Sequence, residues 1–276
     1  MSPSHNPRPN EVPVALISGA ASGIGLAMCR LLLRRGFEVY GVDLNEVALE
    51  ALQAQLGPQF HPRCLDVCDQ ASMQALAEEI GARHHRLELL HNNAGILAFG
   101  DFDKLSLEQY RRVMEVNFWA PLQAIRCFLP LLRQASSPCV INTASAAGLL
   151  GFPLIAPYTV SKFALVGLGE ALACELATDG IHILSVCPPA VRTALFDHNP
   201  ASLSDTWQHR INRALERFAL EPEALAEAIL DAVIARRHLL VPGRELALLH
   251  LLKRSAPEYY LRLWAMVGRI RASRRR

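Results

Sequence analysis

Short apolar runs alternate with longer helical segments along most of this chain. The apolar runs have the length of strands and are bounded by turn residues, which predicts strands over residues 14–18, 37–43, 60–67, 87–92, 139–145, 181–188 and 238–243. Between them, apolar positions recur at helical spacing and predict helices over residues 26–36, 45–57, 69–84, 106–134, 158–177 and 225–234. Strands joined by helices of this length imply right-handed crossovers. We therefore expect a doubly wound parallel sheet with helices on both faces, a three-layer α/β/α domain.

The composition fits one folded domain with two short additions. Hydrophobic residues make up 51% of the 276 residues and charged residues only 20%, which excludes a disordered chain. No apolar run reaches the roughly 18 residues of a transmembrane helix. Because no linker or repeat interrupts the alternation, residues 12–243 are predicted to form a single domain. A flexible leader over residues 1–11 precedes it, and an extension over residues 244–276 follows.

The extension differs from the rest of the chain in charge. Residues 236–276 contain 11 Lys and Arg against 2 Asp and Glu, whereas the whole chain has a net charge of only +2. Near the end, arginines alternate with apolar residues at Leu261, Trp264, Val267 and Ile270, the pattern of a basic amphipathic helix. Such a helix binds a membrane surface as a peripheral contact, or packs on its own domain or a partner subunit. The small net charge gives no reason to expect a nucleic-acid partner.

The cysteine pattern predicts a reducing compartment. The chain has seven cysteines, an odd number, and most lie inside apolar runs, which favours reduced, buried thiols in a cytoplasmic protein. The spacing of Cys64 and Cys68 has no second Cys or His pair to complete a zinc site, so no metal is expected. Residues 1–11 lack the apolar region of a signal peptide.

A glycine-rich turn follows the first predicted strand, with the sequence Ser18-Gly19-Ala20-Ala21-Ser22-Gly23-Ile24-Gly25. Such a turn lets the backbone approach a pyrophosphate, and the following helix presents free N–H groups and the positive end of its dipole. A tight turn without a ligand is the alternative. Asp43 ends the second strand, where a carboxylate accepts hydrogen bonds from ribose hydroxyls and repels a 2′-phosphate. It has no Lys or Arg neighbour, which favours NAD over NADP, although Asp43 could instead cap the next helix.

Tyr158 and Lys162 are one helical turn apart and project from the same helix face. A neighbouring ammonium favours the phenolate and so lowers the pKa of a tyrosine toward the operating pH, which would make Tyr158 a proton donor or acceptor. Ser145 precedes them at the end of a buried strand, where ligands of parallel sheets bind. Taken alone, the Tyr–Lys pair could equally lie on the surface.

Together these residues resemble the short-chain dehydrogenase/reductase family, whose main branch has a single Rossmann-like domain. The resemblance covers residues 12–243 and rests on an ordered set of motifs: residues 18–25, Asp43, Asp66-Val67, Asn92-Asn93-Ala94-Gly95, Asn117, Ser145, Tyr158 with Lys162, and Pro188 with Thr193. It departs from the family at Ser18, where Thr is usual, and at Pro189, where Gly is usual. Because proline fixes φ and lacks an N–H, Pro189 affects the region of Val191 and Thr193.

The resemblance implies a role for each matched residue. Tyr158 would be the general acid and base, Lys162 would lower its pKa and hold the nicotinamide ribose, Ser145 would bind the substrate oxygen, and Asn117 would hold a water of the proton relay. Asn117 could instead bond only to backbone. The other implied contacts to the dinucleotide are Ser18, Gly19, Ser22, Gly23, Ile24, Gly25, Asp43, Leu44, Asp66, Val67, Asn93, Ala94, Gly95, Pro188, Val191 and Thr193. The family also implies a homodimer or homotetramer built on the helices 106–134 and 158–177.

The substrate side is predicted to be apolar. Residues 194–222 lie where the family has its substrate lid and include Leu195, Phe196, Trp207 and Phe218, opposite residues 151–154. This composition suits a small hydrophobic alcohol or ketone, although Arg192 and Arg210 could recognise an acid group. We therefore expect an NAD-dependent oxidoreductase acting on a secondary alcohol or ketone. An NADPH-dependent 3-oxoacyl-type reductase and a non-catalytic dinucleotide-binding protein are the alternatives.

Overall fold

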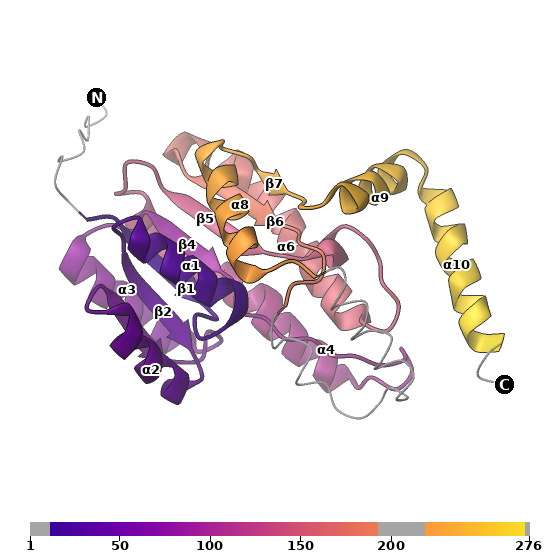
Figure 1. The fold of residues 1–276 in the computed structure, drawn as a ribbon, viewed down its shortest axis with the longest axis horizontal. Coiled ribbons are helices and arrows are strands. Elements are labelled where there is room, and N and C mark those ends of the chain that lie inside the picture. The colour runs from indigo at the N-terminus through magenta and orange to yellow at the C-terminus, as the bar shows by residue number, and fades with distance from the viewer. Residues whose placement is uncertain (1–11, 193–218, 274–276) are drawn as a thin grey trace.

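The computed structural model describes residues 12–192 and 219–273, which form a parallel sheet between two layers of helices (Figure 1). The elements in chain order are β1 (Val14–Ser18), α1 (Gly23–Arg34), β2 (Glu38–Asp43), α2 (Glu46–Leu56), β3 (Phe60–Cys64), α3 (Gln70–His84), β4 (Leu89–Asn92), α4 (Leu107–Met114), the π-helical turn η1 (Glu115–Trp119), α5 (Ala120–Leu132), β5 (Cys139–Thr143), the short turn η2 (Ala146–Gly148), α6 (Ala156–Glu175), the short turn η3 (Ala177–Asp179), β6 (His182–Val186), α8 (Pro222–Ile234), β7 (Leu239–Leu240), α9 (Arg244–Ser255) and α10 (Pro257–Ser273).

The sheet has the strand order β3-β2-β1-β4-β5-β6-β7, and all of its described pairings are parallel. The chain winds outward from β1 to β3, then crosses back to place β4 on the other side of β1. At this reversal the crossovers leave the sheet on opposite faces, which opens a crevice at the carboxyl ends of β1 and β4. The predicted Rossmann-like, doubly wound sheet is confirmed.

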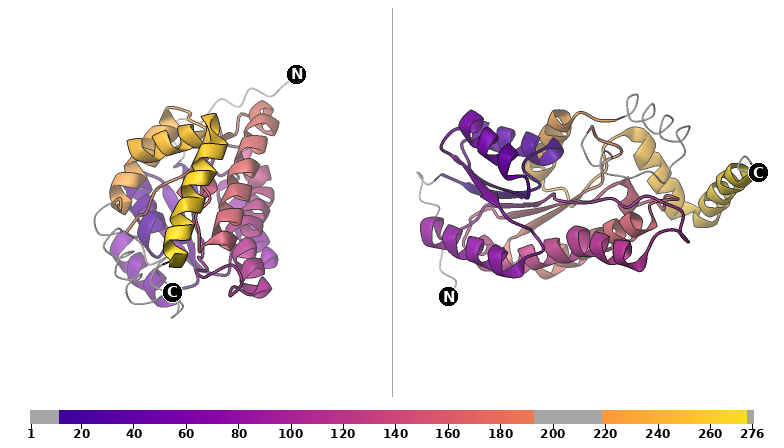
Figure 2. Two further views of the ribbon diagram at one scale, coloured as in Figure 1. Left: turned by 90° about the vertical axis from the view of Figure 1, so that its right-hand side faces the viewer. Right: turned by 90° about the horizontal axis from the view of Figure 1, so that it is seen from below.

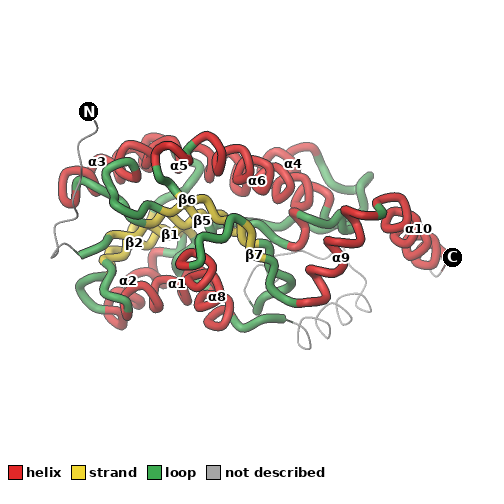
Figure 3. The backbone as a smooth tube through the Cα atoms, turned by 90° about the horizontal axis from the view of Figure 1, so that it is seen from above, coloured by secondary structure: helices red, strands yellow, loops and turns green. Residues whose placement is uncertain are grey.

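The two faces of the sheet bury separate apolar clusters. Helices α1, α2 and α8 lie on one side, and α3, α5 and α6 on the other (Figures 2 and 3). Successive residues of β1 serve both clusters, because Leu16 packs with Phe128 of α5 whereas Ile17 packs with Met28 of α1. Burial on both faces explains why this strand is a continuous apolar run rather than an alternating one.

Several predicted boundaries were wrong. The strands expected over residues 139–145 and 181–188 end at Thr143 and Val186, so Ser145 and Pro188 follow their strands rather than ending them. The strand expected over residues 60–67 ends at Cys64 and contains Pro62, which is tolerated because β3 is the edge strand of the sheet. The strand expected over residues 238–243 shortens to Leu239–Leu240. The helix expected over residues 106–134 is divided into α4 and α5 by the π-helical turn η1, where Asn117 lies.

The extension over residues 244–276 contains two helices, α9 and α10, at the end of the molecule remote from α2 and α3 (Figure 1). It is attached through Leu246, Tyr260 and Trp264, which pack in a cluster with Leu149 and Leu150. Trp264 therefore packs on its own domain, whereas Leu261 is exposed. Among the helices described, none is long and apolar enough to cross a membrane.

Candidate active site

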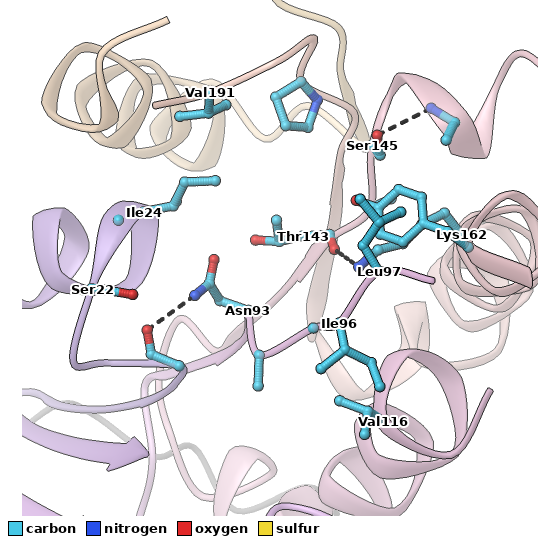
Figure 4. A pocket seen from close by; sticks show the side chains of 18 of the residues that line it. Ser22, Ile24, Asn93, Ile96, Leu97, Val116, Thr143, Ser145, Lys162 and Val191 are labelled. Atoms are coloured by element: carbon cyan, nitrogen blue, oxygen red, sulfur yellow. Dashed lines mark hydrogen bonds between the residues drawn. The ribbon is translucent and has the colours of Figure 1, made fainter. Parts of the chain in front are cut away.

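A cavity of about 750 Å³ lies at the carboxyl ends of the central strands. Figure 4 shows Ser22 and Ile24 on one side and Ser145 and Lys162 on the opposite side. The predicted site residues that line it are Gly19, Ser22, Gly23, Ile24, Asp43, Leu44, Asp66, Val67, Asn93, Ala94, Gly95, Ser145, Tyr158, Lys162, Pro188 and Val191. Residues from seven separate segments of the sequence are thus brought to one space.

The glycine-rich turn between β1 and α1 is tightly packed against the segment after β4. Gly19 has a positive φ of 67°, and an added Cβ there would lie 3.0 Å from Asn93 Nδ2 and 3.1 Å from Ala94 Cα. Ser22 begins α1 without a side-chain cap, and the first turn of the helix has no acidic residue. The amino end of α1 therefore keeps N–H groups available for an acceptor in the cavity.

Ser18 and Gly25 are not among the described residues that line the cavity. The Ser18 hydroxyl accepts hydrogen bonds from the backbone N–H groups of Asn93 and Ala94, at 3.0 and 3.1 Å. A Cβ at Gly25 would lie 2.0 Å from the Gly19 carbonyl oxygen. Both residues therefore shape the turn that the cavity needs.

Asp43 lies at the carboxyl end of β2, which β1 and β4 separate from β5 and from the Ser145 that follows it. Its Oδ2 accepts a hydrogen bond from Ala21 N at 3.0 Å, and its Oδ1 accepts one from Asn45 N at 3.1 Å. Each carboxylate oxygen keeps further acceptor capacity for a ligand. Asn45, and not Asp43, caps the start of α2, because the Asn45 side chain accepts a hydrogen bond from Ala48 N at 3.0 Å.

The cavity wall next to Asp43 contains a second carboxylate, Asp66. A hydrogen bond from the Cys68 backbone N–H, together with Arg112, holds the pKa of Asp66 below its usual value. Arg112 Nη2 lies 3.5 Å from Asp66 Oδ2. The guanidinium is thus committed to Asp66, a contact that the sequence analysis missed because 46 positions separate the two residues in the chain.

Ser145, Tyr158 and Lys162 meet beside β5, where all three line the cavity. Ser145 caps η2 by accepting from Ala147 N at 3.1 Å, and its hydroxyl lowers the pKa of Tyr158. Lys162 Nζ donates to the Thr143 carbonyl oxygen at 2.8 Å and lies 5.5 Å from the centre of the Tyr158 ring. The Tyr158 and Lys162 side chains thus project to one place from the first turns of α6, as their spacing predicts.

Burial dominates the titration of this pair. It raises the pKa of Tyr158 to about 12, against the Ser145 hydroxyl, which lowers it. It lowers the pKa of Lys162 to about 8, because an ammonium is poorly solvated where only 3% of the residue is exposed. The sequence predicted a lowered pKa for Tyr158 from the charge on Lys162. In this structure the direction is the opposite: burial raises the pKa of Tyr158, and the group that lowers it is Ser145 rather than Lys162.

Asn117 is fully buried, and its side chain bonds to the backbone of Ile96 and to the Ser161 hydroxyl. Its Oδ1 accepts from Ile96 N at 2.8 Å, and its Nδ2 donates to Ile96 O at 2.9 Å and to Ser161 Oγ at 3.1 Å. Asn117 does not line the cavity. This geometry matches the backbone-bonding alternative, in which η1 fixes the chain that follows Gly95.

Several apolar residues that line the cavity were not singled out from the sequence: Ile96, Leu97, Val116, Ile155 and Ala190. Ile96 and Leu97 directly follow the matched motif at residues 92–95, and this continuation was the available signal. Val116 enters through η1, which the sequence pattern did not predict. Thr143 lies two residues before Ser145 and supplies the carbonyl that holds Lys162.

The predicted lid lies largely outside the described residues, as do Thr193, Leu195, Phe196, Trp207, Arg210 and Phe218. At its two ends Val191 pairs with Leu220 in a parallel bridge, and Arg192 N donates to Leu220 O at 3.1 Å. The Arg192 side chain lies 3.2 Å from Glu221 Oε1. This ion pair favours the solvated role of Arg192 over recognition of an acidic ligand.

In the part of the chain that the structure describes, no group of three His, Cys, Asp or Glu side chains is placed to hold a metal. All seven cysteines are free thiols. Cys29, Cys139 and Cys187 are buried as predicted, whereas Cys64 and Cys174 are exposed.

Comparison with known proteins agrees with this architecture. Residues 13–203 match the family model for short chain dehydrogenases. A cyclohexanol dehydrogenase of Acinetobacter sp. (strain SE19) is 36% identical over 66% of this chain and 74% of its own length. A 3-alpha-(or 20-beta)-hydroxysteroid dehydrogenase of Mycobacterium bovis is 32% identical over 74% of this chain and 77% of its own. A short-chain dehydrogenase/reductase of Burkholderia phymatum, solved in complex with NAD, superposes with a TM-score of 0.82 and 28% identity, covering 90% of this chain and 95% of that one.

Fold and cavity together define a dinucleotide-binding α/β enzyme of the doubly wound type. The chain belongs to the short-chain dehydrogenase family, a family of oxidoreductases that act on CH–OH donors with a nicotinamide dinucleotide.

Proposed function

We propose that this protein is an NAD-dependent oxidoreductase that interconverts a hydrophobic secondary alcohol and its ketone. The observation that carries the proposal is that one cavity is lined both by Ser145, Tyr158 and Lys162, beside β5, and by Asp43, at the end of β2 on the other side of β1 and β4. Bound NAD would supply the hydride acceptor, and the protein would position it and manage the proton.

The residues present fit a dinucleotide. The backbone at Gly19, which leaves no room for a side chain, and the uncapped amino end of α1 suit a pyrophosphate. Asp43 would accept hydrogen bonds from the adenosine ribose, next to Leu44. Asp66 and Val67 would lie at the adenine, with Asn93, Ala94 and Gly95 along the adenosine. Lys162 would hold the second ribose, since only one of its donors is used by Thr143. Pro188, Val191 and Thr193 are proposed for the carboxamide end.

Asp43 supports NAD rather than NADP. A 2′-phosphate placed against this carboxylate would be repelled unless a cation intervened. Lys162 and Arg112 are the basic residues among those described that line the cavity. Lys162 lies beside β5, on the other side of β1 and β4 from Asp43, and Arg112 is paired with Asp66. This weakens the case for an NADPH-dependent 3-oxoacyl-type reductase.

Tyr158 would transfer the proton. In its phenolate form it would take the proton of the alcohol during oxidation, and in its phenol form it would give its proton to the carbonyl oxygen during reduction. Ser145 Oγ, adjacent to the Tyr158 hydroxyl, would donate a hydrogen bond to the same oxygen and hold it in place. Lys162, when it carries its proton, would favour the phenolate form. Asn117 would support this site by fixing the chain at Ile96.

The substrate end of the cavity supports an uncharged, apolar substrate. Its walls include Leu97, Phe152 and Ile155, and Lys162 is the charged residue among those described there. The relatives that act on cyclohexanol and on hydroxysteroids are consistent with cyclic secondary alcohols.

The test is a panel of cyclopentanol, cyclohexanol and a hydroxysteroid with NAD and with NADP, followed by NADH or NADPH absorbance. We expect turnover with NAD to exceed that with NADP. Replacing Tyr158 by Phe should lower kcat by about 10²–10⁴-fold while NADH still binds. Turnover only with NADPH would favour the 3-oxoacyl-type reductase. Unchanged turnover in Tyr158→Phe, or NADH binding without turnover of any alcohol or ketone, would favour the non-catalytic alternative.

We also propose a homo-oligomer. Trp119, Val160 and Phe163 are 45%, 53% and 37% exposed, and they lie on the helical segments that the resemblance assigns to subunit contacts. A single-subunit mass by light scattering would contradict this. The seven unpaired thiols support a reducing location such as the cytoplasm.

Finally, we propose that α9 makes a peripheral contact with an anionic membrane surface. Leu248, Leu251 and Leu252 are 65%, 60% and 42% exposed on the side of α9 opposite buried Leu246. The exposed residues Arg244 and Arg254 lie near the two ends of this helix. Apolar side chains between basic ones match lipid acyl chains and anionic head groups. A second copy docked extension to extension would bring two strongly basic segments together.

A further inference from the structure

The loop of residues 149–155 forms the wall of the cavity beside Ser145. It connects η2 to α6, and its residues Phe152 and Ile155 line the cavity. If the cavity takes the substrate proposed above, the position of Phe152 limits the size of the group that fits. What fixes this loop therefore affects which alcohols can bind.

The loop is not stabilised by its own backbone conformation. Leu154 has a positive φ of 72°, a strained value for a residue with a branched side chain. The Leu154 carbonyl oxygen accepts a hydrogen bond from Gly100 N at 2.8 Å, which holds one side of the loop. A strained conformation persists only where the surroundings hold it, so the other side needs contacts as well.

Those contacts come from the C-terminal extension. Lys253 of α9 donates to the Leu149 carbonyl oxygen at 2.5 Å, and the Tyr260 hydroxyl donates to the Gly151 carbonyl oxygen at 3.4 Å. The Trp264 ring meets the Phe152 ring edge to face, with centroids 5.8 Å apart. Tyr260 is only 2% exposed, so this face of the extension is packed and not a loose contact.

The extension also lies beyond residues 13–203, which match the family model. We propose that it is a working part of the substrate pocket of this enzyme, in which Trp264 is a positioning residue that fixes Phe152 and so sets the size of the accepted alcohol. The proposal rests on the function proposed above. Trp264 is not among the described residues that line the cavity and would act only through Phe152.

The kinetic test compares Trp264→Ala with Leu261→Ala, an exposed residue of the same helix. Without the ring contact, Phe152 is free to turn and the wall loses its shape. We expect KM for cyclopentanol to rise about two- to tenfold, the range of one aromatic pair, with a smaller change for a hydroxysteroid. NADH affinity and kcat should stay near those of the wild type. Trp264→Phe, which keeps a ring, should restore most of the preference. Equal loss of kcat/KM for both alcohols would overturn the proposal.

A second readout does not need activity. Thermolysin cleavage of the Leu154–Ile155 bond, followed by mass spectrometry of the full chain, measures how firmly the loop is held. We expect faster cleavage in Trp264→Ala than in Leu261→Ala. If the wild type oxidises neither alcohol, the proposed function fails while this comparison still decides the inference. If Trp264→Ala does not fold, Tyr260→Phe removes only one hydrogen bond and should change cleavage in the same direction. Cleavage equal to the control in both variants would refute the role of the extension.

Discussion

Burial acts on Tyr158 and Lys162 in opposite pKa directions, and in both cases it favours the uncharged form. The phenol keeps its proton to about pH 12, and the lysine loses its proton near pH 8. Without a bound dinucleotide, the pair is therefore held as a neutral phenol beside an amine of reduced basicity. Ligand groups that stabilise the ammonium would raise the pKa of Lys162 and thereby favour the phenolate.

The lowered pKa of Lys162 predicts how stability depends on pH. Between about pH 8 and 10.5, the unfolded chain holds a proton that folded Lys162 has released. The contribution of Lys162 to the free energy of unfolding therefore rises with pH over this window, by up to about 3 kcal/mol. Urea denaturation of wild type and Lys162→Met across the window should give a difference that grows with pH.

Tyr158 provides the control for this measurement. Its folded pKa of about 12 is above the ordinary value of 10.0, so its contribution is constant below pH 10 and is lost only above it. Tyr158→Phe should therefore follow the wild type between pH 8 and 10. A constant difference between wild type and Lys162→Met would show that burial does not control the lysine.

At the level of single residues, the sequence predicted which side chains meet but not how they are used. The order of Asp43, Ser145, Tyr158 and Lys162 along alternating strands and helices was enough to place them at one sheet edge. The commitments of Ser18 and Asn117 to backbone groups depend on the packing of β1 and η1 against the segment after β4. Sequence spacing holds no information on that packing.

Among the elements, the π-helical turn η1 holds the backbone at Ile96 through Asn117. A wider turn changes the direction of side chains relative to a continuous helix, and here it brings Asn117 against Ile96. The apolar spacing of residues 106–134 could not reveal this turn, because the distinction lies in tertiary hydrogen bonds. The strands were easier to predict, since buried parallel strands are short apolar runs.

Replacing Asn117 by Ala tests the role of this turn. The change leaves the Ile96 N–H and carbonyl without their side-chain partner, and buried unpaired groups of this kind cost about 1–3 kcal/mol each. We expect a loss of about 2 kcal/mol or more in urea denaturation, with weaker NADH binding. Glu108→Ala, on the exposed face of α4, is the matched control. Equal stability of the two variants would show that η1 does not hold the Ile96 segment.

On the scale of the whole molecule, charge and exposed leucines are concentrated at one end. Residues 236–276 carry 11 basic and 2 acidic side chains, although the chain as a whole is nearly neutral. The sequence predicted this asymmetry and left membrane contact and self-packing open. In the structure Tyr260 and Trp264 pack on the domain, whereas Leu248 and Leu251 are exposed.

The exposed leucines of α9 and its basic residues predict selective binding to anionic vesicles. The full chain should sediment with phosphatidylcholine vesicles that contain phosphatidylglycerol, and salt should weaken this binding. Leu248→Ser with Leu251→Ser should lower the partition coefficient at least about tenfold. The control pair Val47→Ser and Ile234→Ser, exposed apolar residues elsewhere, should bind as the wild type does. Equal losses in both pairs, or a change in subunit mass in the leucine variant alone, would contradict the membrane assignment.

The parallel bridge between Val191 and Leu220 has a practical consequence. It brings the two ends of the intervening segment next to each other on the body of the enzyme. A segment with adjoining ends can be exchanged for one of different length without pulling the sheet apart, since loop closure depends only weakly on length. Residues 193–218 are therefore suited to replacement by the corresponding segments of other dehydrogenases. We expect such replacements to change which alcohols the enzyme accepts.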